Sequence, residues 1–146
     1  MTDTIRAATM HDANELARLL TQLGHPTNAS QIVETWDTWR AEKNHAFVAE
    51  RDDGSLAGVV TLHSMLVLHR PKPVGRITSL IVDAPSRGLG IGTALVAAAE
   101  SELATRGCGL LEITSNLKRT DAHAFYESLG YERTSFRLAK TIGSVA

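Results

Sequence analysis

The stretch Val82-Asp83-Ala84-Pro85-Ser86-Arg87-Gly88-Leu89-Gly90-Ile91-Gly92-Thr93 determines the fold that this chain is expected to adopt. A buried strand is predicted to lead into it, and a long helix is predicted to begin within it and to end before Gly107. The first N–H groups of a helix have no backbone partner and carry partial positive charge, so they attract anions. Glycines at 88, 90 and 92 let the backbone approach a ligand, and Arg87 adds a forked donor. The segment therefore predicts a turn that holds a pyrophosphate group.

Two common phosphate-binding patterns do not match this turn. A Walker loop requires a Gly-Lys-Ser/Thr sequence, which does not follow these glycines. The dinucleotide-binding fingerprint requires Gly-x-Gly-x-x-Gly, whereas here the glycines occupy alternate positions. A purely structural explanation stays open, in which the glycines only tighten a strand-to-helix turn.

The patterns on either side of the turn predict a mixed sheet covered by helices. Strands are expected at Thr4–Ala8, His45–Glu50, Leu56–Leu68, Gly75–Asp83, Leu110–Thr114 and Tyr131–Lys140. Helices are expected between Thr9 and Gly24, from Asn28 or Ser30 to Lys43, within Gly88–Arg106, and at Thr120–Leu129. The order β-α-α-β-β-β-α-β-α-β indicates one α/β or α+β domain over residues 1–146.

Composition and charge exclude several classes of protein. The 146 residues include 15 Lys plus Arg and 16 Asp plus Glu, for a net charge of -1. We therefore expect neither a nucleic-acid nor a membrane partner, because the chain has no bulk field of either sign. Cys108 is the only cysteine, which excludes an intrachain disulfide and a zinc site built from several thiolates. The chain shows neither a membrane-spanning apolar stretch nor a signal-peptide pattern, which predicts a cytoplasmic protein.

Two motifs indicate a family. The segment from Arg87 to Gly92 resembles the acetyl-CoA signature (Gln/Arg-x-x-Gly-x-Gly/Ala) of the GNAT superfamily of N-acetyltransferases. A second motif of that superfamily is similar to Ser115-Asn116, Arg119, Ala122-His123, Phe125-Tyr126 and Gly130-Tyr131. The resemblance extends from Thr4 to about Lys140. It implies a mixed sheet of about six to seven strands flanked by about four helices.

The resemblance also implies a set of residues for acetyl-CoA, the co-substrate, and implies no metal. The pyrophosphate would bind at Arg87, Gly88, Leu89, Gly90, Ile91, Gly92 and Thr93. The pantetheine arm would pair with the strand at Leu80, Ile81 and Val82, and Asn116 and Arg119 would contact the cofactor. Leu80, Ile81 and Val82 also suit a core, Asn116 suits a turn, and Arg119 suits a solvated helix start.

By the same resemblance, the protein is an acyltransferase of the EC 2.3.1 type. It would transfer the acetyl group to a primary amine of a small molecule or peptide by direct attack in a ternary complex. Tyr126 would be the general acid that protonates the departing sulfur, although it also suits packing beside Phe125. Many relatives carry a glutamate base where this chain has Thr78. Glu112, His63 and His123 remain open as alternatives.

The acceptor amine is expected between the first two helices and the ends of the later strands. That region includes Leu23–Asn28, Trp36, Trp39 and His63–Val74, and the two tryptophans also suit core packing. The second helix has few acidic residues, so an aminoglycoside acceptor is compatible with the sequence but not indicated by it.

Two further expectations concern an alternative function and the oligomeric state. Because Thr78 replaces the family's carboxylate, a weak or inactive acyl-CoA-binding sensor is the alternative function. A homodimer is compatible with the family, and Phe136 and Leu138 suit a sheet edge.

Overall fold

A computed structural model describes residues 3–114, 120–135 and 137–143 of the chain. The chain forms two compact units, Met1–Ile113 and Thr114–Ala146, each described by itself below. The first contains the sheet and the glycine turn. The second contains α4 (Thr120–Ser128).

The first unit is built on a mixed sheet with strand order β1-β2-β3-β4-β5. Its strands are β1 (Thr4–Ala7), β2 (His45–Glu50), β3 (Leu56–Met65), β4 (Val74–Val82) and β5 (Leu110–Ile113). Its helices are η1 (Met10–Asp12), α1 (Ala13–Gln22), α2 (Ala29–Ala41), η2 (Ala84–Ser86) and α3 (Ile91–Thr105). Neighbouring strands are antiparallel except β4 and β5, which are parallel.

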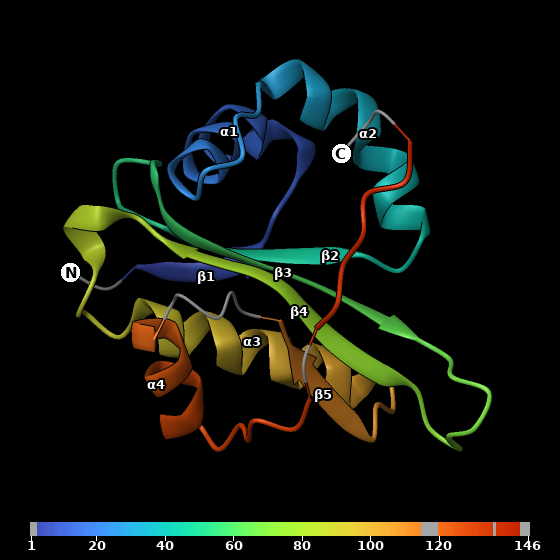
Figure 1. The fold of residues 1–146 in the computed structure, drawn as a ribbon. Coiled ribbons are helices and arrows are strands. Elements are labelled where there is room, and N and C mark those ends of the chain that lie inside the picture. The colour runs from blue at the N-terminus through green and yellow to red at the C-terminus, as the bar shows by residue number, and fades with distance from the viewer. Residues whose placement is uncertain (1–2, 115–119, 136, 144–146) are drawn as a thin grey trace. The chain divides into compact units, whose positions relative to one another are not determined.

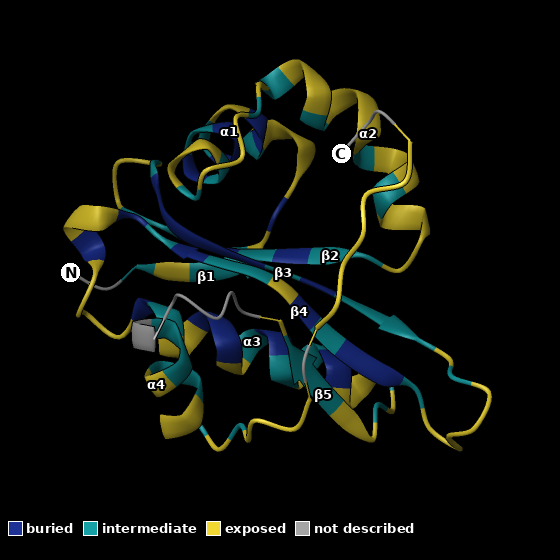
Figure 2. Cartoon of the chain, viewed as in Figure 1, coloured by how far each residue is buried: buried dark blue, intermediate teal, exposed yellow. Residues whose placement is uncertain are grey.

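Helices cover both faces of this sheet: α1 and α2 lie on one face and α3 lies on the other (Figure 1). The core on the α1 side is a cluster of Ala8, Leu16, Leu19, Ala46, Val48, Leu56, Val59 and Ile81. On the other side, α3 packs closely against β3, because a Cβ at Gly58 would lie 3.0 Å from Leu95 Cδ1. The first half of β3, residues 56–60, is therefore buried on two faces and is dark blue in Figure 2, whereas β4 is buried mainly in its first residues and is exposed at Thr78.

Local sequence signals account for the ends of these elements. Thr9 and Asp12 form a capping box at the start of η1, and Asn28 caps α2 in the same way with Gln31. In the hairpin between β2 and β3, Gly54 adopts a φ of +88°, a conformation that favours glycine. These turns confirm the expected break between the strands at His45–Glu50 and Leu56–Leu68 and the expected helix starts.

Strand β4 has a bulge on its β3 side and an unpaired stretch on its β5 side. A bulge shifts the β3–β4 register, so that Thr61 pairs with Ser79 and Leu62 pairs with Ile77, leaving Thr78 as the extra residue. On the other side, β5 pairs with β4 only from Val74 to Ile77. Among the described residues, Thr78–Val82 therefore has no strand beside it on the β5 side.

The prediction of the sheet is wrong in its last strand and in the end of β3. The described residues of the stretch Tyr131–Lys140 form no strand, so the described part of the chain has five strands rather than six or seven. The alternating pattern gives this stretch β-propensity, but a strand also needs a neighbour that accepts its backbone hydrogen bonds. Strand β3 ends at Met65 rather than Leu68, because the chain turns there and leaves Leu66 and Leu68 exposed.

Candidate functional site

The glycine turn connects the end of β4 to the start of α3. Gly88 and Gly90 have φ values of +80° and +82°, which side chains with a Cβ rarely adopt. Gly90 is also the N-cap of α3, and no side chain caps the helix there. The backbone conformation therefore explains both glycines. The N-cap residue offers no side-chain acceptor to the first N–H groups of α3, and none is found among the other described residues.

The surface in front of these N–H groups is open. A Cβ built at Gly88 or Gly90 would have no atom within 4 Å, and Leu89 is 71% exposed. Thr93 is also exposed, whereas Ile91 is buried and Gly92 is half-buried. The first turn of α3 contains no acidic residue to repel an anion. Among the described residues, no atom near the Cβ positions of Gly88 and Gly90 therefore blocks the approach of an anion to the positive end of this 15-residue helix.

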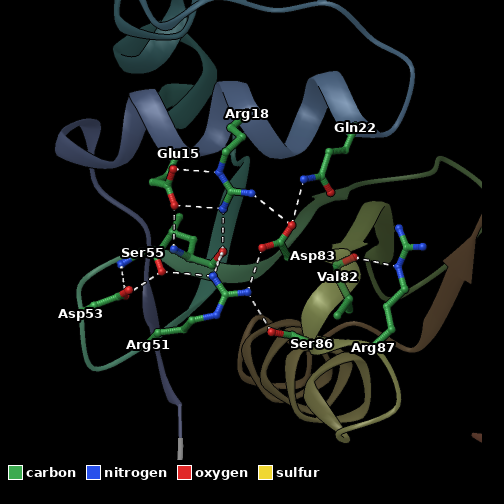
Figure 3. A network of polar contacts seen from close by, with 11 residues as sticks. Glu15, Arg18, Gln22, Arg51, Asp53, Ser55, Val82, Asp83, Ser86 and Arg87 are labelled. Carbon is green, nitrogen blue, oxygen red and sulfur yellow. Dashed lines mark hydrogen bonds and ion pairs between the residues drawn. The ribbon is translucent and has the colours of Figure 1, made fainter.

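Arg87 stands beside this helix start. Its side chain is exposed, and its Nε donates a 3.1 Å hydrogen bond to the carbonyl oxygen of Val82. This bond connects the guanidinium group of Arg87 to the last residue of β4, so its positive charge lies next to the turn (Figure 3). A guanidinium so held is a suitable partner for a phosphate group.

The open edge of β4 carries the three residues expected to contact the pantetheine arm. Ile81 is buried in the core cluster, whereas Leu80 and Val82 are half-buried. The side chain of Ile81 therefore serves the core. The backbone edge of the same strand has no neighbour on the β5 side in the described residues.

A buried carboxylate holds the turn in place. Asp83, which follows β4, is only 5% exposed and receives hydrogen bonds from Arg18 (3.1 Å), Gln22 (2.8 Å) and Arg51 (2.8 Å). Burial alone raises the pKa of Asp83, but these three donors outweigh that effect and lower the pKa to about 2. The carboxylate is therefore charged at neutral pH.

The two arginines extend this network in both directions, as Figure 3 shows. Arg51 also donates to Ser86 Oγ at 2.8 Å, so it bridges β4 and the turn. Arg18 pairs with Glu15 at 2.8 Å and donates to the carbonyl oxygen of Leu56 at 2.9 Å. The network links α1, the β2–β3 hairpin and the glycine turn. No local pattern in the sequence reveals this network, because Asp83 is 65 residues away from Arg18 and 32 residues away from Arg51.

A pocket of about 420 Å³ lies on the α1–α2 face of the sheet. Its apolar lining includes Leu16, Leu20, Ile32, Trp36, Trp39 and Val59. Both tryptophans also pack against the core cluster, and their ring centroids are 5.3 Å apart. At its inner wall the pocket reaches Thr61 and Ser79, beside the bulge of β4.

The hydroxyl groups at the bulge lie together. The Oγ1 atoms of Thr61 and Thr78 are 2.7 Å apart, and Thr61 is also hydrogen-bonded to Ser79. Thr78 is exposed, so the position where the resemblance would place a glutamate base carries a neutral hydroxyl group that contacts another hydroxyl group.

Two of the open candidates for the base lie further along the same sheet. His63 and Glu112 are both paired in register with Arg76, and Glu112 forms a 3.8 Å ion pair with it. Burial lowers the pKa of His63, and the charges of Arg76 and Arg106 lower it further, so the imidazole is neutral at pH 7. His63 Nε2 is buried and has no hydrogen-bond partner among the described residues.

The second unit contains the expected general acid. Tyr126 lies on α4, with its ring centroid 5.4 Å from that of Phe125 and 6.2 Å from that of Tyr131. His123 lies on the same helix and is half-buried. Asn116 and Arg119 lie outside the described residues.

Two kinds of feature are absent from the described residues. No helix in that part of the chain is long and apolar enough to cross a membrane. The same residues hold no group of three or more His, Cys, Asp or Glu side chains arranged to bind a metal ion.

Together, the sheet, the open strand edge and the glycine turn define an α/β protein in which a helix start of the kind that suits an anion lies after an open strand edge. The sequence matches the model of the acetyltransferase (GNAT) family over residues 10–131, and the chain belongs to that family. The expected family and fold class are thereby confirmed.

Three similar proteins illustrate the relationship. The chain is 40% identical over 90 residues to an aminoalkylphosphonate N-acetyltransferase of Salmonella typhimurium, an alignment that covers 62% of this chain and 58% of that enzyme. It is 31% identical over 135 residues to an aminoglycoside N(6')-acetyltransferase type 1 of Stenotrophomonas maltophilia, covering 90% and 87%. An acetyltransferase from Trypanosoma brucei has the same fold, with a TM-score of 0.86 at 22% identity over 96% and 99% of the chains. The names of these relatives support the expected enzyme class, an acyltransferase.

Replacing Asp83 by Asn tests the network. The substitution removes the charge that compensates Arg18 and Arg51, and it should lower the free energy of unfolding by about 3 kcal/mol at pH 7. Because the folded pKa lies below the ordinary value of 3.8, the contribution of the carboxylate is complete above pH 4 and is lost as the pH falls toward 2. Urea unfolding of both proteins at several pH values measures this difference.

Asp52→Asn, an exposed change in the hairpin, is the matched control and should be nearly neutral. The free energies of unfolding of wild type and Asp83→Asn should converge as the pH falls toward 2. A constant difference between them would contradict a stabilising role for the charged carboxylate of Asp83.

Proposed function

We propose that this protein is an N-acetyltransferase that transfers the acetyl group of acetyl-CoA to a primary amine. One observation carries the proposal: the glycine turn connects the start of α3, which no side chain of its N-cap residue caps, to a strand whose outer edge has no neighbour in the described residues. The first feature suits a pyrophosphate, and the second suits an extended arm ending in a thioester. Membership of the GNAT family supports the same function.

The donor site uses residues from the turn and from β4. The backbone N–H groups of residues 88–93 bind the pyrophosphate, and Arg87 adds a positive charge. Residues Leu80–Val82 offer backbone donors and acceptors to the pantetheine arm. One N–H group of this edge polarises the thioester oxygen as negative charge develops on it. Asn116 and Arg119 complete the donor site in this proposal.

The reaction is a direct attack. The neutral amine nitrogen forms a bond to the thioester carbon, the carbon–sulfur bond breaks, and the products are an amide and free CoA. The nitrogen loses one proton, and the sulfur gains one from Tyr126, the general acid. Holding both substrates on one strand supplies much of the acceleration. Thr78 offers no carboxylate for the amine proton, so water beside the bulge hydroxyl groups accepts it.

Substitution of Gly90 tests the donor site. Gly90→Asp places a negative charge where the pyrophosphate binds, and it should weaken acetyl-CoA binding in calorimetry by about a hundredfold or more. Gly54→Asp is a matched control: Gly54 also has a positive φ, of +88°, and open space around its Cβ position. The control carries the same backbone strain and the same added charge, and it should bind acetyl-CoA as the wild type does. Equal loss in both variants, or no binding by the wild type, refutes the donor site.

Replacing Tyr126 by Phe tests the general acid. The change removes one hydroxyl group, and kcat should fall by about a hundredfold or more. The Kd for acetyl-CoA should change far less than kcat, because the proposed pyrophosphate and pantetheine contacts are made by other residues. Thiol release measures kcat, and Tyr131→Phe on the neighbouring ring of the same unit is the control. Unchanged turnover in Tyr126→Phe would refute the role of Tyr126 as general acid. Binding of acetyl-CoA by the wild type with no thiol release for any amine would favour the sensor.

A further inference from the structure

The described lining of the pocket on the α1–α2 face carries no charge. The substrates named for the two relatives are charged and require charged partners. None of the described lining residues is an Asp, Glu, Lys or Arg. Polar groups among them are neutral: Thr27, Gln31, Thr35, Thr61 and Ser79. The acidic side chains of α2, Glu34 and Asp37, are exposed and do not line the pocket.

This neutrality argues against two kinds of acceptor. An aminoglycoside brings several ammonium groups, and burying them against neutral walls leaves each without a counter-charge. An aminoalkylphosphonate brings an anionic phosphonate, which requires an arginine, a lysine or a helix start, and none of the described lining provides one. The relatives whose names mention these substrates share the family with this chain but need not share its pocket.

The same walls favour an apolar body. Trp36 and Trp39 present two indole rings tilted by 40°, and aliphatic side chains from α1, α2 and β3 surround them. Aromatic rings pack well against such a surface in edge-to-face or offset arrangements. A volume of about 420 Å³ is within the range of pockets that bind small molecules.

The polar end of the pocket lies where an amine would be needed. Thr61 and Ser79 are part of the lining and belong to the hydroxyl group cluster at the β4 bulge. This bulge immediately follows the last residue of β4 that pairs with β5. An amine that hydrogen-bonds to these hydroxyl groups therefore sits beside the open strand edge, with its apolar body between the tryptophans.

We infer that the acceptor is a primary amine on an uncharged apolar body, and that an arylalkylamine fits the pocket best. The inference rests on the proposed function. It names the acceptor class for the same reaction, in which the amine nitrogen replaces the CoA sulfur on the acetyl carbon and gives up one proton.

Binding is measurable without catalysis, because the two tryptophans of the chain both line this pocket. Titration of the wild type with 2-phenylethylamine should change the tryptophan fluorescence and saturate, whereas 2-aminoethylphosphonate and kanamycin should leave it unchanged. In thiol-release assays, kcat/KM for 2-phenylethylamine should exceed that for either other amine by about a hundredfold or more.

A matched pair of variants locates the acceptor. Thr35 and Thr38 are both exposed on α2, but only Thr35 lines the pocket. Thr35→Arg adds a charge that repels the ammonium form, and KM for 2-phenylethylamine should rise by about tenfold or more. Thr38→Arg should not change it, and the Kd for acetyl-CoA should be the same in both variants.

The possible outcomes separate the two proposals. If acetyl-CoA binds and kanamycin or the phosphonate is the preferred substrate, the acetyltransferase function stands and the acceptor class is wrong. Equal KM values in the two threonine variants also overturn the acceptor site. If acetyl-CoA does not bind and no amine releases thiol, the proposed function fails and the inference fails with it.

Discussion

The carboxylate of Asp83 is the contact on which the rest of the candidate site depends. It lies at the point where β4 ends and the glycine turn begins, and it accepts hydrogen bonds from two arginines and a glutamine. Arg18 comes from α1 and Arg51 from the β2–β3 hairpin, so three separate parts of the chain meet at one charge. Because Asp83 is buried, its charge and those of the arginines have to be present together.

The strand before this contact serves two purposes. Its side chains fill the core on one face and carry hydroxyl groups into the pocket, while its backbone edge beyond Ile77 stays without a neighbour in the described residues. The bulge at Thr78 lies at the junction of these two features. In the proposed reaction, donor and acceptor thus meet on one strand, and α3 supplies the positive end that anchors the donor.

Much of the first unit was predictable from its sequence because glycines, prolines and capping residues mark its element ends. The β2–β3 hairpin, the cap at Asn28 and the start of α3 follow directly from local residue types. The prediction of a strand at Tyr131–Lys140 was wrong for the described residues of that stretch. An alternating pattern gives a stretch β-propensity but does not show that a neighbouring strand is available to pair with it. The bulge at Thr78 was also missed, since register depends on how β3 and β4 pair.

The site was predictable to the extent that it is local. The turn from Arg87 to Gly92 is a continuous motif, and Gly88 and Gly90 have the positive φ values that such a turn requires, whereas Gly92 lies within α3. The network of Asp83 and the walls of the pocket come from residues far apart in the sequence, so no spacing reveals them. Trp36 and Trp39 could be interpreted as core or as acceptor site, and they both pack on the core and line the pocket.

Amide hydrogen exchange, measured by NMR with and without acetyl-CoA, tests the central claim that β4 and the glycine turn together form the donor site. If this claim is correct, acetyl-CoA slows exchange at the N–H groups of residues 88–93. It also slows exchange at alternate residues of Thr78–Val82, whose N–H groups point to the open edge. Protection confined to other parts of the chain, with exchange in these two segments unchanged, would contradict it.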